Sequence, residues 1–456
     1  MIMKHRRVLF AVFLVFAGCA VMGTGVTAAA PASTAACTRA EDFGAVPDDG
    51  QDDRVQLQAA IDAAQASTGC LELGPGTFHA TRKPTAGVVS IPSLRISDSL
   101  VFRGAGQGVT TLAMLGPSVN TADWWLLNVA GATDVTVTGL TLDGAKRTNT
   151  GEQTHLLQLV GPTEHVVVDH VSFNLPVIGP STGGDCIRLL GTATDWVRDT
   201  TIRDTLGVDC DRSFVGLQRG VDGLVIERSE SVKVGDQAID FEPTGGEAFN
   251  CQPVIKNVFM RALTLRRAST QGLTVTIHGA GCAVAQNVTL TDSIVEDGTV
   301  SILDAADVTL SRLHLRSLPG DSEAAVVARK RVVNLRILDS VIERPIEAGP
   351  GASIRVGNQS GAYPQDVLVS GVRVEQATPG PLVATGGLKR LVIVNTQLVY
   401  TGPPVTNFAV LVCGDATQPA EQPVLIDTTI QGAFGGAVQM CGQFTGPPVL
   451  VRVTGP

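Results

Sequence analysis

Aromatic side chains are scarce in this sequence, since Phe, Trp and Tyr make up only 4% of its 456 residues. Charged residues are 17% and hydrophobic residues 44%, which excludes a disordered chain, because disorder needs few apolar residues and many charges. The absence of any Cys-x-x-Cys pair argues against a structural zinc site. Val, Thr, Leu and Gly dominate instead, which favours many short strands joined by glycine turns.

The N-terminus has the pattern of an export signal. Three positive residues, Lys4, Arg6 and Arg7, precede an apolar run from residue 8 to 17, and three alanines at 28 to 30 offer a cleavage site. That run is too short for a transmembrane helix, and no second long apolar stretch follows. We therefore predict a signal peptide over residues 1–30, a linker over 31–40 and one domain over 41–456, with no transmembrane segment.

A lipid anchor is the alternative to simple secretion. The stretch "FAGC", which ends at Cys19, resembles a bacterial lipoprotein cleavage box, and anchoring there would tether the protein to the cell envelope. In either case the signal takes three positive charges with it, so the formal net charge falls from −9 to −12. Such an acidic protein is a poor candidate for binding nucleic acid or anionic membranes.

A short apolar strand recurs along the chain with a period near 28 residues. Examples are "DCIRLLG" at 185, "QAIDFEP" at 237, "FAVLVCG" at 408 and "GAVQMCG" at 436, and a second strand family interleaves with them. Repetition at a fixed period indicates a solenoid, and two or three strands per repeat without a helix indicate a parallel β-helix. A propeller, which needs four strands in about 40 to 45 residues, does not fit this period.

Eight cysteines remain after the signal, and an exported protein with an even number is expected to form disulfides. Cys413 and Cys441 hold the same place in consecutive repeats, where stacked strands lie about 4.8 Å apart and within reach of a disulfide. The other gaps also approximate one repeat. We therefore predict sequential pairing: Cys37–Cys70, Cys186–Cys210, Cys251–Cys282 and Cys413–Cys441.

Residues 42 to 81 carry the closest likeness to a known family. They read "DFGAVPDDGQDDRVQLQAAIDAAQASTGCLELGPGTFHAT", in which Asp52 or Asp53 caps a helix to about Ala66 with Leu57 and Ile61 in its apolar stripe. This segment resembles the N-terminal motif of pectate-lyase-superfamily proteins. The resemblance implies an all-β, single-stranded right-handed parallel β-helix with an N-terminal cap over 41–81, and a carbohydrate ligand. From the repeats we expect about 10 or 11 turns.

In a parallel β-helix a ligand lies along an outer sheet, so outward polar residues on successive turns are the candidate site. Aligning the strands on their inward residues gives an outward row, and a second outward row follows it. Asp240 and Glu242 share one face of "GDQAIDFEPTGG", roughly 6.6 Å apart at Cα. The first row is Gln158, Arg188, Gly216, Asp240 and Thr274, and the second is Leu190, Gln218, Glu242 and Thr276.

Two local likenesses sharpen the candidate chemistry. "GGDCIRL" resembles a stretch of polygalacturonase-like glycosidases whose aspartates do acid/base work, although only Asp185 carries over because Gly184 replaces the other aspartate. "GDCIR" followed by "DQAID" resembles the calcium-binding turns of pectate lyases, which would make Asp185, Asp236 and Asp240 calcium ligands. The basic residue that such lyases need has no clear match. Arg188, Arg212 and Arg219 are the candidates for it.

The sequence thus supports three hypotheses. The first is a secreted glycoside hydrolase that acts on a polysaccharide without a cofactor, because hydrolysis needs one protonated and one ionised carboxylate. The second is a calcium-dependent polysaccharide lyase, and the third is a non-catalytic binding or surface protein, which the scarcity of aromatic rings favours. A solvated face is the plain alternative for the acids. We expect a monomer, with catalytic Asp240, Glu242, Asp185 and Asp236, and with substrate bound by Arg188, Gln218, Arg219, Gln158 and His278.

Overall fold

Every β-strand pairing in the computed structural model is parallel, as the repeat predicted. The structure describes residues 36–82, 90–115, 123–145, 154–175, 183–244, 246–267, 273–296, 298–317, 320, 323–348, 351–357, 361–414, 421 and 423–455. The signal peptide, with Cys19, and the first half of the expected linker, residues 31–35, lie outside these residues. Residues 38–39, expected in the linker, already form strand β1 (Thr38–Arg39).

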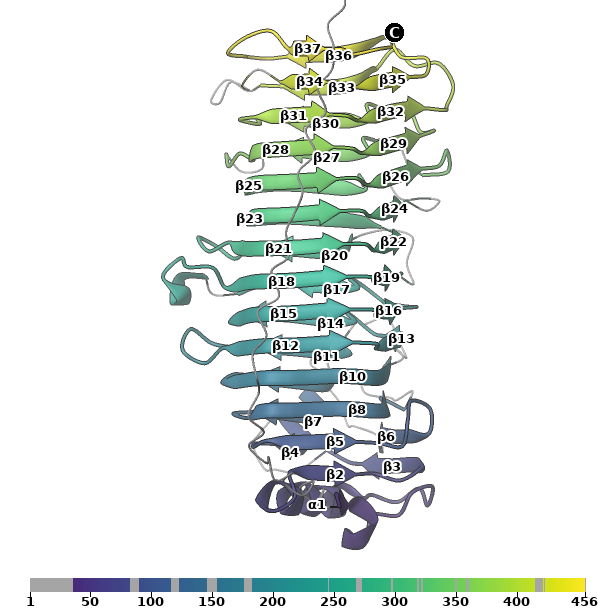
Figure 1. Ribbon diagram of the computed structural model, residues 1–456, viewed down its shortest axis with the longest axis vertical. Helices are drawn as coiled ribbons and strands as arrows, with labels where there is room; N and C mark the ends of the chain where they lie inside the picture. The colour runs from purple at the N-terminus through teal and green to yellow at the C-terminus, as the bar shows by residue number, and fades with distance from the viewer. Residues whose placement is uncertain are drawn as a thin grey trace, which may run out of the picture. The chain divides into compact units, whose positions relative to one another are not determined.

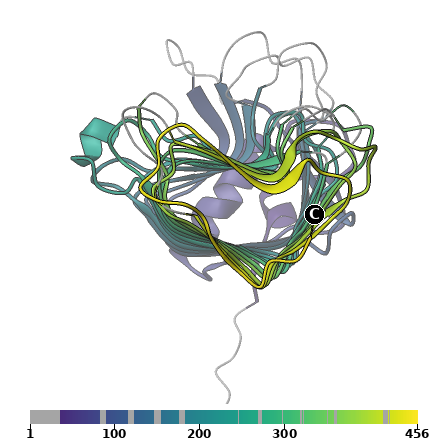
Figure 2. The same cartoon turned by 90° about the horizontal axis from the view of Figure 1, so that it is seen from above.

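The strands form three parallel sheets, in which each turn of the chain adds one strand to each sheet (Figure 1). Four long strands run through a corner and belong to two sheets: β8 (Thr133–Asp143), β10 (Thr163–Leu175), β23 (Thr299–Ser311) and β25 (Val326–Leu338). Figure 2 views the stack end on, where successive turns superpose. The fold is a single-stranded right-handed parallel β-helix of about 12 turns, slightly more than the repeats suggested.

Sheet 1, which carries the candidate site, contains the start of β23 and β25 together with β4 (Ser90–Ile96), β7 (Asp123–Ala130), β9 (Thr154–Val160), β11 (Ile187–Leu190), β14 (Val215–Arg219), β17 (Ile239–Phe241), β20 (Leu273–His278), β27 (Ile354–Gly357), β30 (Val383–Gly386), β33 (Phe408–Cys413) and β36 (Gly436–Cys441).

Sheet 2 contains β1, the first parts of β8 and β10, the last parts of β23 and β25, and the strands β2 (Cys70–Glu72), β5 (Leu100–Arg103), β12 (Val197–Arg203), β15 (Val221–Glu227), β18 (Ile255–Arg261), β21 (Ala285–Thr291), β28 (Gln365–Ser370), β31 (Leu391–Val394), β34 (Val424–Ile426) and β37 (Val449–Val451).

Sheet 3 contains the last parts of β8 and β10 and the strands β3 (Gly76–Ala80), β6 (Thr110–Met114), β13 (Leu206–Cys210), β16 (Glu230–Ser231), β19 (Thr264–Leu265), β22 (Ile294–Glu296), β24 (His314–Arg316), β26 (Val341–Arg344), β29 (Arg373–Gln376), β32 (Gln397–Tyr400) and β35 (Thr429–Gln431).

The core lies inside the coil and is built from stacked aliphatic side chains. Alternation within each strand sends every second residue inward, and the parallel register places equivalent residues directly above one another. In sheet 2 one such buried column is Val137, Val168, Ile202, Ile226, Met260, Leu290, Leu310, Ile337, Val369, Ile393 and Leu425. Each member covers the next, so the core is one continuous column of contacts.

The helix α1 (Arg54–Ala66) covers the N-terminal end of the coil, where strand edges would otherwise be open (Figure 1). Its buried residues are Leu57, Ala60, Ile61 and Ala64, which include Leu57 and Ile61 of the predicted stripe. Asp53 precedes the helix, but its carboxylate accepts the backbone N–H groups of Val46 and His79 rather than capping the helix. Two short 3₁₀ helices, η1 (Ala40–Phe43) and η2 (Gly246–Phe249), complete the elements, and no described helix could span a membrane.

The structure forms the four predicted disulfides. Their Cα–Cα distances are 4.8, 5.6, 5.0 and 4.5 Å for Cys37–Cys70, Cys186–Cys210, Cys251–Cys282 and Cys413–Cys441. Cys413 and Cys441 face each other in register on β33 and β36. The bonds therefore join neighbouring turns, and the last one ties the C-terminal turn to the rest of the coil.

Candidate active site

A polar row crosses the outer face of sheet 1. Gln158 on β9 is in register with Arg188 on β11, which is in register with Gly216 on β14 and then Asp240 on β17. The next member is Thr276 on β20, whose hydroxyl lies 2.8 Å from Asp240 Oδ1 and donates to it. Up to Asp240 this is the row that the alternation of apolar residues predicted.

The row departs from the sequence alignment at β20. Thr274 was expected beside Asp240, because Ile239 was aligned with Leu273. In the structure Ile239 is in register with Val275, so the strand lies two residues further along. Both alignments place threonines outward and valines inward. Alternation alone therefore could not choose between them, and Thr276 was assigned to the wrong row.

The row is buried rather than solvated. Gln158 is fully buried, and Arg188 and Asp240 are 7% and 8% exposed. The sequence pattern predicts that Asp240 and Glu242 project from the sheet into one groove with Asp185 and Arg188. The structure buries Asp185 completely and leaves only Glu242, with half of its side chain exposed, in solvent. A plain solvated face therefore does not describe Asp240.

Asp185 forms a buried ion pair with Arg212. Arg212 Nε and Nη2 donate to the two carboxylate oxygens at 2.9 and 2.8 Å. The carboxylate lies directly over Gly216, where a Cβ atom would come within 2.8 Å of its Oδ2. Burial alone would favour the neutral acid, but the guanidinium outweighs it and holds the pKa of Asp185 below its ordinary value. Asp185 thus fills the outward place on β14 that glycine leaves open.

His155 is part of the same buried cluster, although no functional role was predicted for it. Its Nδ1 accepts the backbone N–H of Asp185 at 2.9 Å, and Arg188 Nη1 lies 2.8 Å from its Nε2. Burial lowers the pKa of His155 to about 3, so the ring is neutral at ordinary pH. His155 and Asp185 are separated by about one repeat. From this spacing alone, the two residues could have been predicted to lie side by side on neighbouring turns.

Asp240 has no cationic hydrogen-bond partner comparable to that of Asp185. Burial raises the pKa of its carboxyl to about 7, and the charges of Asp185 and Glu242 act in the same direction. The Thr276 hydroxyl and the Arg212 charge oppose this rise without cancelling it. Asp240 is therefore a carboxylic acid that holds its proton close to neutral pH.

A pocket of about 310 Å³ opens beside Asp240. It brings together four predicted site residues, Asp236, Asp240, Glu242 and His278, with Arg212 and Thr276. Arg212 Nη1 lies 3.5 Å from Glu242 Oε2, so one guanidinium contacts both Asp185 and Glu242. His278 Nε2 lies 3.0 Å from the Ser301 hydroxyl, and burial lowers the pKa of this histidine to about 4.

The other predicted site residues do not line this pocket. Asp185 and Arg188 lie in the buried cluster, and Gln158 lies further along the row. Gln218 and Arg219 are half-buried at the end of β14, where an irregularity in the pairing puts Arg219 opposite Leu190. Arg219 Nη1 donates to the Thr244 hydroxyl at 3.1 Å.

The three calcium ligands suggested by the likeness to pectate lyases, Asp185, Asp236 and Asp240, do not share one arrangement in the structure. Both oxygens of Asp185 are occupied by Arg212, which places a positive charge where the ion would have to bind. Asp236 and Asp240 line the pocket without it. Calcium needs six to eight oxygen ligands, and this trio offers no shared set.

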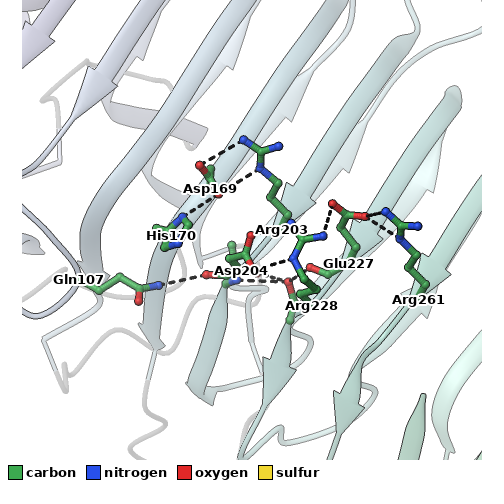
Figure 3. Close-up of polar contacts among 10 residues, drawn as sticks. Gln107, Asp169, His170, Arg203, Asp204, Glu227, Arg228 and Arg261 are labelled. Carbon is green, nitrogen blue, oxygen red and sulfur yellow. Dashed lines mark hydrogen bonds and ion pairs between the residues drawn. The ribbon is translucent and has the colours of Figure 1, made fainter. Parts of the chain in front are cut away.

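A second carboxylate–histidine cluster lies at the corner between sheets 2 and 3 (Figure 3). Asp169, His170 and Asp204 have ligand atoms within 4.8 Å of one another. Arginines already pair with both acids, Arg203 Nε at 3.1 Å from Asp169 and Arg228 Nη2 at 2.8 Å from Asp204. The figure shows these arginines among the carboxylates, so the cluster is a ladder of ion pairs between turns.

Comparison with known proteins supports the fold and gives one local sequence match. No model of a known protein family matches the chain. Mannuronan C5-epimerase AlgE6 of Azotobacter vinelandii is 37% identical over 113 residues, which are 24% of this chain and 12% of that protein. This chain therefore spans only a small part of that relative.

Two solved structures share the fold. The A-module of mannuronan C-5 epimerase AlgE4 from Azotobacter vinelandii superposes with a TM-score of 0.59 at 18% identity, over 91% of this chain and 100% of that one. The tailspike protein of Escherichia coli bacteriophage HK620, solved with a hexasaccharide, has a TM-score of 0.51 at 14% identity, over 91% and 80%. The right-handed parallel β-helix expected from the pectate-lyase resemblance is thus confirmed.

Proposed function

We propose that this protein is a polysaccharide-active enzyme, and that it hydrolyses a glycosidic bond at the Asp240 pocket. One observation carries the proposal: a buried carboxyl that holds its proton to about pH 7 shares a pocket with a half-exposed carboxylate two residues along the strand. Glycoside hydrolysis uses such a pair, with one acid protonated and the other ionised. The carbohydrate-acting β-helix proteins that share the fold support the choice of substrate.

In this mechanism Asp240 is the general acid. Its proton passes to the glycosidic oxygen as the bond to the leaving sugar breaks. Glu242, which Arg212 contacts at 3.5 Å, is the second carboxylate and either activates water or attacks the sugar carbon. Thr276 donates a hydrogen bond to Asp240 Oδ1 and so leaves the other oxygen to carry the proton.

The charge of the pocket favours an uncharged sugar at the cleaved bond. Asp236, Asp240 and Glu242 line it, and Arg212, the arginine that faces them, is already paired with Asp185. A uronate there would bring its carboxylate against those of Asp236 and Glu242, and like charges at short range repel. We therefore expect a neutral unit in this pocket.

Uronate epimerisation is a second candidate, because the local match to AlgE6 points to it. A screen of neutral and acidic polysaccharides, with and without EDTA, separates the reactions. New reducing ends without ultraviolet-absorbing products indicate hydrolysis, whereas unsaturated, absorbing products indicate a lyase. Deuterium incorporated at the sugar ring from heavy water, without chain cleavage, indicates epimerisation and would contradict the hydrolase.

A further inference from the structure

A second pocket, of about 400 Å³, lies on sheet 1 closer to the C-terminus. Strands β25, β27, β30 and β33 form its floor, and the described residues that line it include Arg329 and Arg355 and no Asp or Glu. Between Asp240 on β17 and Arg355 on β27 the sheet advances by four strands, or about 19 Å. The two pockets therefore share one outer sheet, but they have opposite charge.

Two glycines lie in the lining of this pocket, each as the last residue of its strand. Gly357 and Gly386 occupy successive outward positions in register with Arg329 on one side and Cys413 on the other. Neither has a positive φ, and no irregularity in the pairing is present there. A Cβ atom on Gly386 would meet nothing within 4 Å, so no neighbouring backbone requires the glycine either.

A glycine near a strand end can mark a bend, or a place where a ligand approaches the backbone. Gly386 ends β30, and the bend at Gly387, which has a positive φ, follows it directly. Gly386 also leaves open space above the strand backbone, where a ligand can approach closely. A flat sugar ring lying on Gly357 and Gly386 would contact the strand backbone directly.

The arginines define the charge of that ligand. Arg355 is exposed and has no acidic partner among the described residues, whereas Arg329 Nη2 lies 3.2 Å from Glu323 Oε2. In a chain of net charge −9, a pocket whose described lining holds two arginines and no acid attracts anions. A guanidinium binds a carboxylate or sulfate through paired hydrogen bonds.

We infer that this second pocket, lined by Arg329, Arg355, Gly357 and Gly386, binds an anionic sugar unit. The group that Arg355 recognises is a carboxylate or a sulfate ester on a sugar whose ring rests on the two glycines. The inference does not depend on hydrolysis at Asp240, because its test measures binding alone. If both sites act on one polymer, that polymer carries acidic units several sugars away from the cleaved bond.

The test is calorimetric binding of three probes: a galacturonate trimer, a neutral galactose trimer and a sulfated galactose oligosaccharide. Wild-type protein should bind at least one anionic probe and not the neutral one. Arg355→Gln should weaken that binding about tenfold, the size expected for a lost charged hydrogen bond. Gly386→Asp should weaken it more than Gly386→Asn, which adds similar bulk without charge.

Arg336→Gln is the matched control, because it removes an exposed arginine from sheet 2 on the same strand, β25. It should leave binding unchanged, and thermal unfolding should show all variants folded. Binding of the galacturonate alone assigns a carboxylate, and binding of the sulfated probe alone assigns a sulfate. Three results would overturn the inference. They are equal binding of the neutral trimer, no binding of either anionic probe, and binding that neither Arg355→Gln nor Gly386→Asp weakens. Loss of hydrolysis at Asp240 would leave it untouched.

Discussion

Asp185 and Asp240 are buried carboxylates two turns apart, on either side of β14, and their partners give them opposite protonation. Arg212 donates two hydrogen bonds to the Asp185 carboxylate, and this holds the pKa of Asp185 below its ordinary value. Asp240 receives only the Thr276 hydroxyl, so burial prevails and its pKa rises to about 7. Catalytic roles for both acids were predicted from the sequence pattern. The pairing of Asp185 with Arg212 favours a positioning role for it, and Asp240 stays the candidate acid.

Asp240→Asn should change how stability depends on pH. An unfolded aspartate loses its proton near its ordinary pKa of 3.8, whereas folded Asp240 keeps it to about 7. The folded state therefore binds more protons in this window, and the contribution of Asp240 to stability falls as pH rises from about 4 to 7. The whole effect amounts to a few kcal/mol at most, at about 1.4 kcal/mol per pKa unit.

Urea unfolding of wild type and Asp240→Asn at several pH values measures this difference. His155 and His278 have lowered pKa values and act in the opposite direction, but they are common to both proteins. The variant should gain relative stability between pH 4 and 7 and hold the gain above pH 7. A pH-independent difference between the two proteins would show that Asp240 titrates normally.

Asp185→Asn should destabilise the protein strongly. It leaves the buried Arg212 with Glu242 as its remaining acidic partner, and breaking one side of a buried ion pair costs about 3–5 kcal/mol. Chemical denaturation at pH 7 checks this, with Asp307→Asn at a surface position of sheet 2 as the control. A loss below about 1 kcal/mol, the range of exposed pairs, would contradict a structural role for Asp185.

At the scale of the strand, alternation placed the inward and outward faces correctly but not every register. Ile239 and Phe241 are inward and Asp240 is outward, as the sequence pattern required. The shift at β20 was not predictable, because two threonines alternate with apolar residues in either alignment. The burial of Gln158, Arg188 and Asp240 could not be predicted either. The alternation of residues along a strand does not show which other parts of the chain cover its polar face.

Two outward glycines of sheet 1 should respond oppositely to alanine. At Gly216 the added Cβ would come within 2.8 Å of the Asp185 carboxylate, which Arg212 holds in place. At Gly386 it would meet nothing. Thermal unfolding should therefore show a lower Tm for Gly216→Ala, and for Gly386→Ala a gain of about 0.5–1 kcal/mol from the stiffer unfolded chain. Equal effects of the two substitutions would disprove the close approach at Gly216.

At the scale of the whole molecule, the sequence was most informative because a repeat constrains every turn at once. The period near 28 predicted the coil, and the same spacing predicted the disulfides that join neighbouring turns. The N-terminal end is closed by α1, while β36 and β37 at the other end remain half-exposed. The two ends of the coil therefore differ in protection.

Replacing Cys413 and Cys441 by serine should loosen the C-terminal turns only. Removing a native disulfide typically costs 2–5 kcal/mol, and in a solenoid the loss stays near the altered repeats. Amide hydrogen exchange should quicken in β33 to β37 and stay unchanged in β9 to β20 around the pocket. Faster exchange throughout the coil would mean that the solenoid unfolds as one cooperative unit.

The central claim is that Asp240 and Glu242 act together on a polysaccharide. The most direct test compares wild type, Asp240→Asn and Glu242→Gln on the polysaccharide that the screen identifies, by initial rates of reducing-end release across pH. Each substitution should lower the rate about 10² to 10⁴-fold, and the wild-type rate should fall above about pH 7 as Asp240 loses its proton. Full activity in both variants would contradict the claim and place the chemistry elsewhere on the coil.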